Sequence, residues 1–208
     1  MDWQLDPAEV RVLGALLEKE VATPDYYPLS LNALVNACNQ KSNREPVVSY
    51  DDDTVEHALE GLRAKGLALR ITGGDTRVPK HAQRFTEKFN LGRREAAVMC
   101  LLMVRGPQTV GELRGRSERL YTFDDLEAVE STLQRLAEME FVKKLPRQVG
   151  FKEQRWAQLL AGDVLVAEEP AATPAADRGP NDRERIARLE AELADLRREF
   201  DEFRKSFE

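Results

Sequence analysis

Few residues of this sequence have the types and spacing that catalysis or metal binding requires. The sequence has two histidines, His57 and His81, and neither has a cysteine or a second histidine at the spacing of a metal site. It also lacks a phosphate-binding P-loop, a Gly-x-Ser-x-Gly nucleophile motif and a dinucleotide fingerprint. We therefore expect a binding protein rather than an enzyme, with no cofactor and no metal.

A polar stretch at residues 39–46 and the basic residues of two predicted hairpins could bind a ligand such as double-stranded DNA. The candidate contacts are Asn39, Gln40, Lys41, Asn43 and Arg44 in the stretch, Arg77 and Lys80 in one hairpin, and Lys143, Lys144 and Arg147 in the other. In the alternative interpretation, Asn39, Gln40 and Asn43 only cap the preceding helix and satisfy nearby backbone groups.

Composition limits the class of protein. The 208 residues carry a net charge of −6, so the chain is not coated with basic residues, although local basic patches remain possible. No apolar run is long enough to span a membrane, and the first residues lack the features of a signal peptide. We expect a cytoplasmic protein in which Cys38 and Cys100 are buried thiols.

Apolar spacing and capping residues predict three helices in the first part of the chain. The run Asp-Pro-Ala-Glu at residues 6–9 is typical of a capped helix start, and this helix is expected to end near Glu20. Apolar residues three and four positions apart predict further helices at residues 31–38 and 51–65.

A hairpin is predicted after the third helix. Leu67, Leu69 and Ile71 alternate with other residues, so we expect a strand with one buried face. A glycine-rich turn at residues 73–75 leads to a second strand at residues 77–80. Three helices followed by a hairpin predict a winged helix-turn-helix.

The same pattern recurs in the second part of the chain. Residues 91–95 parallel 5–9, residues 109–113 parallel 30–34, residues 129–136 parallel 55–62, and residues 141–145 parallel 67–71. The first copy is longer between its second and third helices, where the polar stretch at residues 39–46 lies. Since the second copy is expected to fold without an equivalent of these residues, the fold does not require them. Extra loop length on a rigid scaffold often forms a binding site, so we favour a binding role for this stretch.

The predicted third helices are unsuited to DNA. In a winged helix this element usually enters the major groove. Residues 51–65 carry five acidic and two basic side chains, and residues 124–140 carry six acidic side chains against Arg135. Because phosphate repulsion would oppose insertion of either helix, we expect any DNA contact to come from the hairpins and the polar stretch.

The end of the chain has the apolar spacing of a coiled coil. The seam residues are Ile186, Leu189, Leu193, Leu196, Phe200 and Phe203, followed by Phe207. A parallel homodimer would pair Arg185 with Glu190, Glu192 with Arg197, and Glu199 with Arg204. The alternatives are a helix that folds back on the winged helices and one that binds a separate partner.

Several motifs resemble the YceH family of bacterial proteins. They are the run from Tyr27 to Val47, Leu17-Glu-Lys-Glu with Thr23-Pro24, and the run from Arg105 to Arg114, in which Val110 replaces an expected proline. The resemblance spans residues 5–160 and implies a tandem winged-helix fold of uncharacterised function. No catalytic or ligand-binding residue can be transferred from it.

We therefore predict a mainly α chain with small β-hairpins. It comprises two winged helix-turn-helix domains at residues 1–88 and 89–165, a disordered linker at 166–181 and a coiled-coil helix at 182–208. One functional hypothesis is a transcription-linked regulator that binds DNA through its wings and the Lys41/Arg44 loop. The other is a protein–protein adaptor that uses acidic winged helices as a scaffold.

Overall fold

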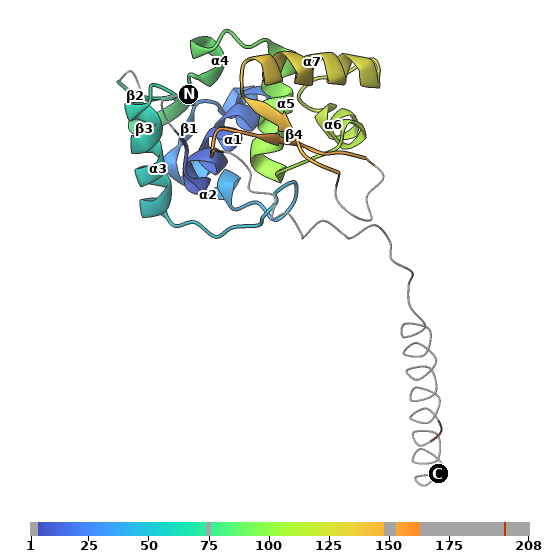
Figure 1. The fold of residues 1–208 in the computed structure, drawn as a ribbon. Helices are drawn as coiled ribbons and strands as arrows, with labels where there is room; N and C mark the ends of the chain where they lie inside the picture. Colours follow the sequence, from blue (N-terminus) through green and yellow to red (C-terminus); the bar gives the residue numbers. More distant parts are fainter. Residues whose placement is uncertain (1–3, 74–75, 148–152, 163–197, 199–208) are drawn as a thin grey trace, which may run out of the picture. The chain divides into compact units, whose positions relative to one another are not determined.

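The computed structural model describes residues 4–73, 76–147, 153–162 and 198 (Figure 1). Met1–Val164 form one compact unit and Leu165–Glu208 a second. The predicted linker and heptad helix fall in the second unit, of which only Arg198 is described. The seam residues and the homodimer therefore lie outside the described residues and stay predictions.

Local capping explains where the helices of the first half begin. Helix α1 (Pro7–Ala22) starts with a complete capping box between Asp6 and Glu9. After a short 3-10 turn, η1 (Pro24–Tyr26), Ser30 caps α2 (Leu31–Cys38) and Asp51 caps α3 (Asp52–Ala64). Each predicted helix is present, and its start agrees with the predicted one.

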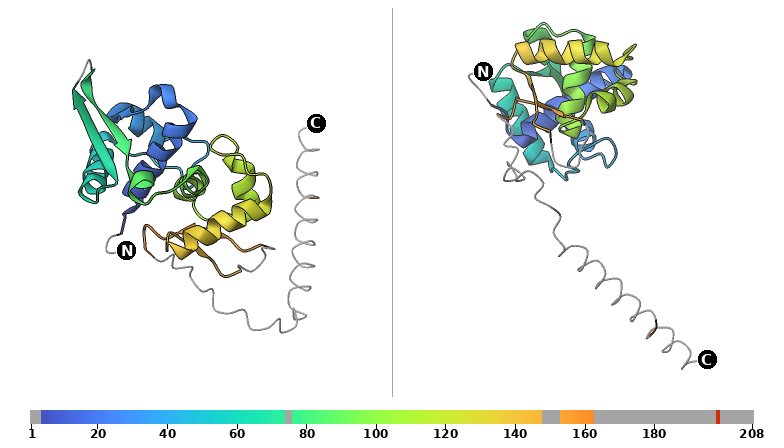
Figure 2. Two further views of the ribbon diagram at one scale, coloured as in Figure 1. Left: turned by 90° about the horizontal axis from the view of Figure 1, so that it is seen from above. Right: turned by 45° about the vertical axis from the view of Figure 1, so that its right-hand side comes forward.

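A three-stranded antiparallel sheet completes the first half. Strands β1 (Leu29–Ser30), β2 (Ala68–Gly73) and β3 (Thr76–Gln83) lie in the order β1-β3-β2. The β2–β3 hairpin projects beyond the helices, as the left view of Figure 2 shows. A short helix, α4 (Phe85–Lys88), then leads into the second half.

The predicted burial of Leu69 and Ile71 is wrong. Both side chains are exposed, at 41% and 43%, and so is Val78 of the facing strand, at 56%. Within β2 only Ala68 is buried, and the residues that follow it are exposed on both faces of the strand. Because the hairpin projects beyond the helices, alternation alone could not tell whether either face of the strand would be covered.

The second half repeats the element order of the first. It contains α5 (Arg93–Arg105), α6 (Val110–Ser117), α7 (Leu126–Glu138), β4 (Val142–Lys144) and β5 (Trp156–Gln158). An isolated bridge between Gln108 and Trp156 stands where β1 stands in the first half. A mainly helical chain with small antiparallel hairpins is thus confirmed.

The two halves share one hydrophobic core along α1 and α5. Gly14 allows close approach, since a Cβ atom there would lie 2.8 Å from Val104 Cγ1 and 2.9 Å from Met103 Cβ. The buried Cys100 thiol donates to the Gly14 carbonyl at 3.6 Å. Cys38 is also a buried free thiol, and burial raises its pKa to about 12.

Aromatic rings add a second contact between the halves. Phe85 and Phe89, from α4 and its end, pack edge-to-face against Phe141 with ring centroids 5.4 and 4.9 Å away. The Leu5 amide also donates to the Leu160 carbonyl at 2.7 Å. The predicted domains at residues 1–88 and 89–165 therefore pack as parts of one unit.

Within the described ranges, no helix has the length and apolar character needed to cross a membrane.

Candidate functional site

The site is built around the loop between α2 and α3, which Asn39 closes at its base. The Asn39 side-chain nitrogen donates to the Tyr50 carbonyl at 2.7 Å, and its oxygen accepts from the Tyr50 amide at 2.8 Å. This paired contact is the kind of local backbone bonding that the alternative interpretation of the loop proposed. Asn39 therefore shapes the loop, and we do not assign it to the binding surface.

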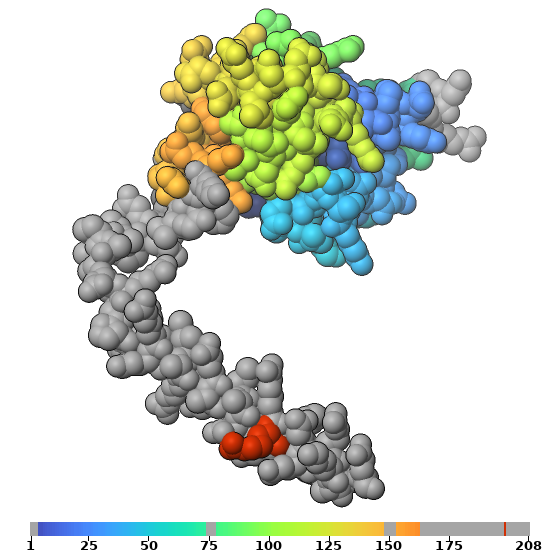
Figure 3. Space-filling view, turned by 90° about the vertical axis from the view of Figure 1, so that its right-hand side faces the viewer, coloured from blue at the N-terminus to red at the C-terminus, as the bar shows by residue number. Residues whose placement is uncertain are grey.

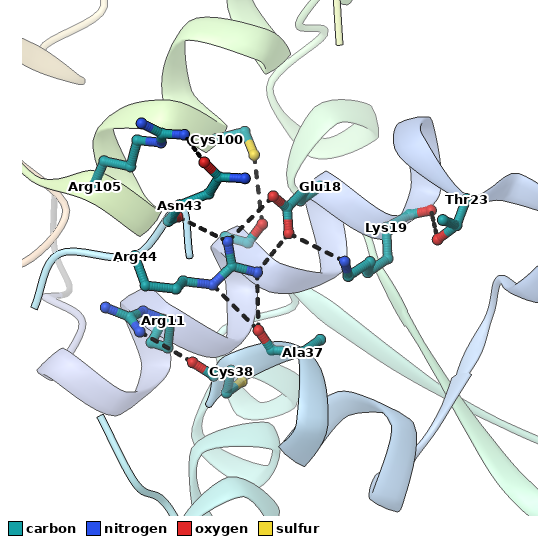
Figure 4. Close-up of polar contacts among 11 residues, drawn as sticks. Arg11, Glu18, Lys19, Thr23, Ala37, Cys38, Asn43, Arg44, Cys100 and Arg105 are labelled. Carbon is teal, nitrogen blue, oxygen red and sulfur yellow. Dashed lines mark hydrogen bonds and ion pairs between the residues drawn. The ribbon is translucent and has the colours of Figure 1, made fainter. Parts of the chain in front are cut away.

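Arg44 lies inside the protein, although the sequence suggested a ligand contact on the loop (Figure 4). Its guanidinium nitrogens donate to the two Glu18 carboxylate oxygens at 3.2 and 2.5 Å. Arg44 Nη2 also donates to the Ala37 carbonyl at 2.8 Å. Because its donors are used within the fold, Arg44 is not available to an external phosphate, and we remove it from the candidate contacts.

Glu18 remains a carboxylate in this arrangement. Burial alone would raise its pKa, but the hydrogen bonds and positive charge of Arg44 outweigh that effect and lower the pKa below its ordinary value. Lys19 contributes a second cation at 3.6 Å. The charge of Glu18 is therefore matched by its protein neighbours.

Further contacts fix both ends of the loop to α1 and α5. The buried Arg11 side chain donates to the Cys38 carbonyl at 3.0 Å and to the Pro46 carbonyl at 2.6 Å. The Glu45 amide donates to the Val104 carbonyl at 2.9 Å. Arg105 of α5 donates to the side-chain oxygen of Asn43, whose φ of 60° is a left-handed conformation that asparagine tolerates. The loop is thus a fixed wall between the halves.

This wall borders a cationic groove of about 820 Å³. Figure 3 shows this face, with the light-blue loop below the yellow-green α6 and the blue end of α1 beside them. Five cationic side chains line the groove together with one acid: Lys19, Lys41, Arg105, Arg116, Arg119 and Glu18. Since Glu18 is already paired with Arg44, the groove has a strong excess of positive charge.

The five cations differ in how many ion pairs and hydrogen bonds they make with other protein groups. Arg116 pairs with Glu112 at 3.2 Å, and it also donates to Gln108 at 2.9 Å. Lys41 and Arg119 are exposed, and neither has a polar partner in the part of the chain that the structure describes. Lys41 and Arg119 are therefore the side chains most available to an anion.

Arg105, which lines the groove, lies close to other positive charges. It is half-buried, and burial lowers its pKa, as do the charges of Arg116 and Arg44. Its Nε atom is buried without a hydrogen-bond acceptor among the described residues. A negative group bound nearby would stabilise the charged form of this guanidinium.

The sequence-predicted contacts are only partly brought together. Gln40, Lys41 and Asn43 line the groove, whereas none of the predicted hairpin cations does. Of these, Lys80 is half-buried on β3, Arg77 lies on the same strand, and Lys143, Lys144 and Arg147 are exposed at the second hairpin. Lys144 lies over the Trp156 ring, 5.8 Å from its centroid. The loop and the hairpins are therefore separate candidate surfaces.

Sequence reasoning missed Lys19 and Arg105 as members of the site. Each occupies the last turn of its helix, where a basic residue is expected because it interacts favourably with the helix dipole. The parallel positions of α1 and α5 in the duplicated pattern were a usable signal. The meeting of these two helix ends beside the loop, however, depends on packing between the halves.

A metal site was not expected, and in the described ranges no group of three or more histidine, cysteine, aspartate or glutamate residues could hold an ion.

Comparisons with known proteins identify the family. Residues 5–151 match the family model described as "Protein of unknown function, DUF480". A "UPF0502 protein" of Solibacter usitatus is 75% identical over 208 residues, covering 100% of both chains. Similar proteins of Citrifermentans bemidjiense and Opitutus terrae are 54% and 51% identical over 196 residues, covering 93% of this chain and 90% and 83% of theirs. The chain therefore belongs to the DUF480 family of uncharacterised bacterial proteins, as its resemblance to the YceH family predicted.

Proposed function

We propose that this protein is a non-enzymatic, transcription-linked binding protein that contacts the phosphate backbone of double-stranded DNA through the cationic groove. The observation that supports this most is the gathering of five cationic side chains around one acid that is already paired. Affinity for nucleic acid comes largely from the neutralisation of phosphates by lysine and arginine. Phosphate contacts position a protein without reading bases, so the expected binding is weakly dependent on sequence.

The proposal includes a tandem winged-helix architecture used in an unusual way. The order helix, strand, helix, helix, hairpin of the first half and its sheet order β1-β3-β2 support it. In the second half, an isolated bridge between Gln108 and Trp156 replaces the first strand of that order. Insertion of α3 into a major groove is disfavoured, because Asp52, Asp53 and Glu56 lie exposed on it. The loop and α6 are the better candidates for DNA contact.

A protein–protein adaptor is the second candidate function. The exposed apolar face of the β2–β3 hairpin, formed by Leu69, Ile71 and Val78, favours it. Contiguous apolar side chains on a surface are typical of protein contacts, and a phosphate backbone would gain little from them. The homodimer predicted from the tail is compatible with either function.

Fluorescence anisotropy of a labelled random duplex tests the first candidate. We expect full-length protein to bind at about 50 mM salt and to bind much more weakly at about 200 mM. Lys41→Ala with Arg119→Ala removes two exposed cations that have no polar partner among the described residues. If each contacts one phosphate, the slope of log affinity against log salt should fall by about 1.8.

A matched variant distinguishes the groove from the first hairpin. Arg70→Ala with Lys80→Ala removes the same amount of charge from β2 and β3. The groove proposal expects this variant to bind like the original protein. Equal weakening by both pairs would indicate nonspecific charge attraction, and absence of binding at the lower salt would favour the adaptor.

A further inference from the structure

We propose that the cationic groove is a binding site for an oligophosphate group, two or three linked phosphates carried by a small ligand. This inference rests on the groove of the proposed function and names a class of small ligand that would share it. It does not require that the protein bind DNA. The shared chemistry could come from a nucleoside triphosphate or from an inorganic polyphosphate.

The size and position of the groove suit a small polyanion. Its volume of about 820 Å³ falls within the ~300–1,000 Å³ typical of small-ligand pockets. Its walls come from both halves, with Lys41 on the loop, Lys19 on α1 and Arg119 just after α6. A ligand inside could therefore meet cations from more than one side.

The number of cations in the groove favours a ligand with more than one phosphate. Five cations share the cavity, and the single acid that lines it is bonded to Arg44. Burial is the main cause of a lowered pKa at Arg105, and the nearby charges of Arg116 and Arg44 lower it further. Arg116 pairs with Glu112 and Lys19 with Glu18, whereas Lys41, Arg105 and Arg119 have no carboxylate partner among the described residues. Linked phosphates would place several negative charges beside these three cations, where a single phosphate offers fewer.

Neutral side chains of the loop add hydrogen-bonding capacity. Gln40, Ser42 and Asn43 line the groove beside Lys41. No aromatic residue lines this groove in the described structure. Base stacking, which dominates the binding of single-stranded nucleic acid, therefore has no platform within it. These side chains suit recognition of phosphate oxygens rather than of bases.

A neighbouring apolar cavity provides a way to distinguish the two sources. This cavity, of about 510 Å³, lies between α1 and α5 and is lined by Leu17, Val21, Leu91 and Ala97. Leu120 lines both the cavity and the groove. A nucleotide with its phosphates in the groove could place its base here, whereas inorganic polyphosphate would leave the cavity empty.

Isothermal titration calorimetry of the full-length protein with sodium tripolyphosphate is the direct test. We expect saturable binding at constant ionic strength, and at least tenfold weaker binding of orthophosphate. Lys41→Ala with Arg119→Ala should weaken tripolyphosphate binding about tenfold or more, while Arg70→Ala with Lys80→Ala should leave it unchanged. Equal affinity for the two phosphates, or equal loss in both variants, would overturn the proposal.

A second titration with ATP identifies the source of the phosphates. Tighter binding of ATP than of tripolyphosphate, with the difference removed by Ala97→Met, would support a nucleotide whose base enters the apolar cavity. Equal affinities would support inorganic polyphosphate. Failure of both ligands to bind would contradict the oligophosphate site itself.

Competition with the labelled duplex separates this inference from the proposed function. If tripolyphosphate binds and no duplex does, the oligophosphate site stands and the DNA function fails. If duplex binds and tripolyphosphate neither binds nor displaces it, the DNA function stands and the oligophosphate site is refuted. Displacement of the duplex would support both.

Discussion

In the loop between α2 and α3, the role of a side chain does not follow from its residue type alone. Lysine and arginine on a polar loop equally suggest phosphate contact, yet Lys41 is exposed while Arg44 is buried against Glu18. The difference arises because the extended loop folds back on α1, where an internal carboxylate needs a partner. Residue type indicates what a side chain can do, and burial decides whether it is available.

Replacing Arg44 should destabilise the fold more than it affects any ligand. Arg44→Met leaves the Glu18 carboxylate without its main partner, and we expect a loss of roughly 3 kcal/mol in the free energy of unfolding. Urea denaturation followed by circular dichroism measures this. The double variant Glu18→Gln with Arg44→Met should recover part of the loss. A double variant less stable than the single one would contradict the pairing.

His81 should make stability depend on pH. Its Nδ1 atom is buried without a partner among the described residues, and burial, Arg63 and Arg70 lower its pKa below the ordinary 6.5. The folded state therefore favours neutral imidazole, while the unfolded chain protonates near pH 6.5. The stabilisation is fully present above that pH and is lost as the pH falls.

Urea unfolding at pH 7.5 and 5.5 measures the His81 effect. His81→Gln should reduce the difference in unfolding free energy between the two pH values. His57→Gln is the matched control, since His57 is exposed on α3 and should leave the difference unchanged. A larger change from the control than from His81→Gln would refute the assignment.

At the scale of elements, helices were predictable because their signals are local. The capping groups at Asp6, Ser30 and Asp51 lie within three residues of the amides they bond. Burial in the hairpin was harder to predict, because the buried face of a strand depends on which helices cover it. Leu69 and Ile71 alternate as buried residues do, but no described element covers them.

Polar substitution of the exposed hairpin face should therefore be tolerated. We expect Ile71→Ser with Val78→Ser to change the free energy of unfolding by no more than about 0.5 kcal/mol per site. The fully buried Leu67, which immediately precedes the strand, provides the contrast, with Leu67→Ala costing roughly 2–5 kcal/mol. Thermal or urea unfolding compares the two. A large loss from the serine pair would mean that the face is covered in solution.

At the scale of the molecule, the contact between α1 and α5 decides both stability and the site. We expect Gly14→Ala to destabilise the protein by about 1–3 kcal/mol, because the added methyl group would overlap Val104 and Met103. Gly115→Ala on α6 is the control, since nothing lies within 4 Å of its added Cβ. There the higher helix propensity of alanine should stabilise by up to about 1 kcal/mol. Equal effects at both sites would contradict close packing.

The groove itself could not be predicted from the sequence. The repeat pattern predicts two similar halves and an extra loop in one of them. Whether Lys41 meets Arg119 depends on the angle at which α1 packs on α5, which no local pattern encodes. Lys19 and Arg105 were equally hard to predict as groove residues. In the sequence each is an ordinary basic residue at a helix end, and only the fold brings the two helix ends together.

The unequal halves have a consequence for stoichiometry. Two copies of one fold would ordinarily offer two equivalent surfaces, and a ligand could occupy both. Here Gln40, Lys41, Ser42 and Asn43 belong to a loop extension that the second half lacks, so the groove that they form with side chains of both halves is not duplicated by the repeat. The two halves are therefore related by an approximate repeat, but the repeat gives the described part of the chain a single cationic groove. A titration should therefore saturate at one ligand per chain, whether the chains are single or paired.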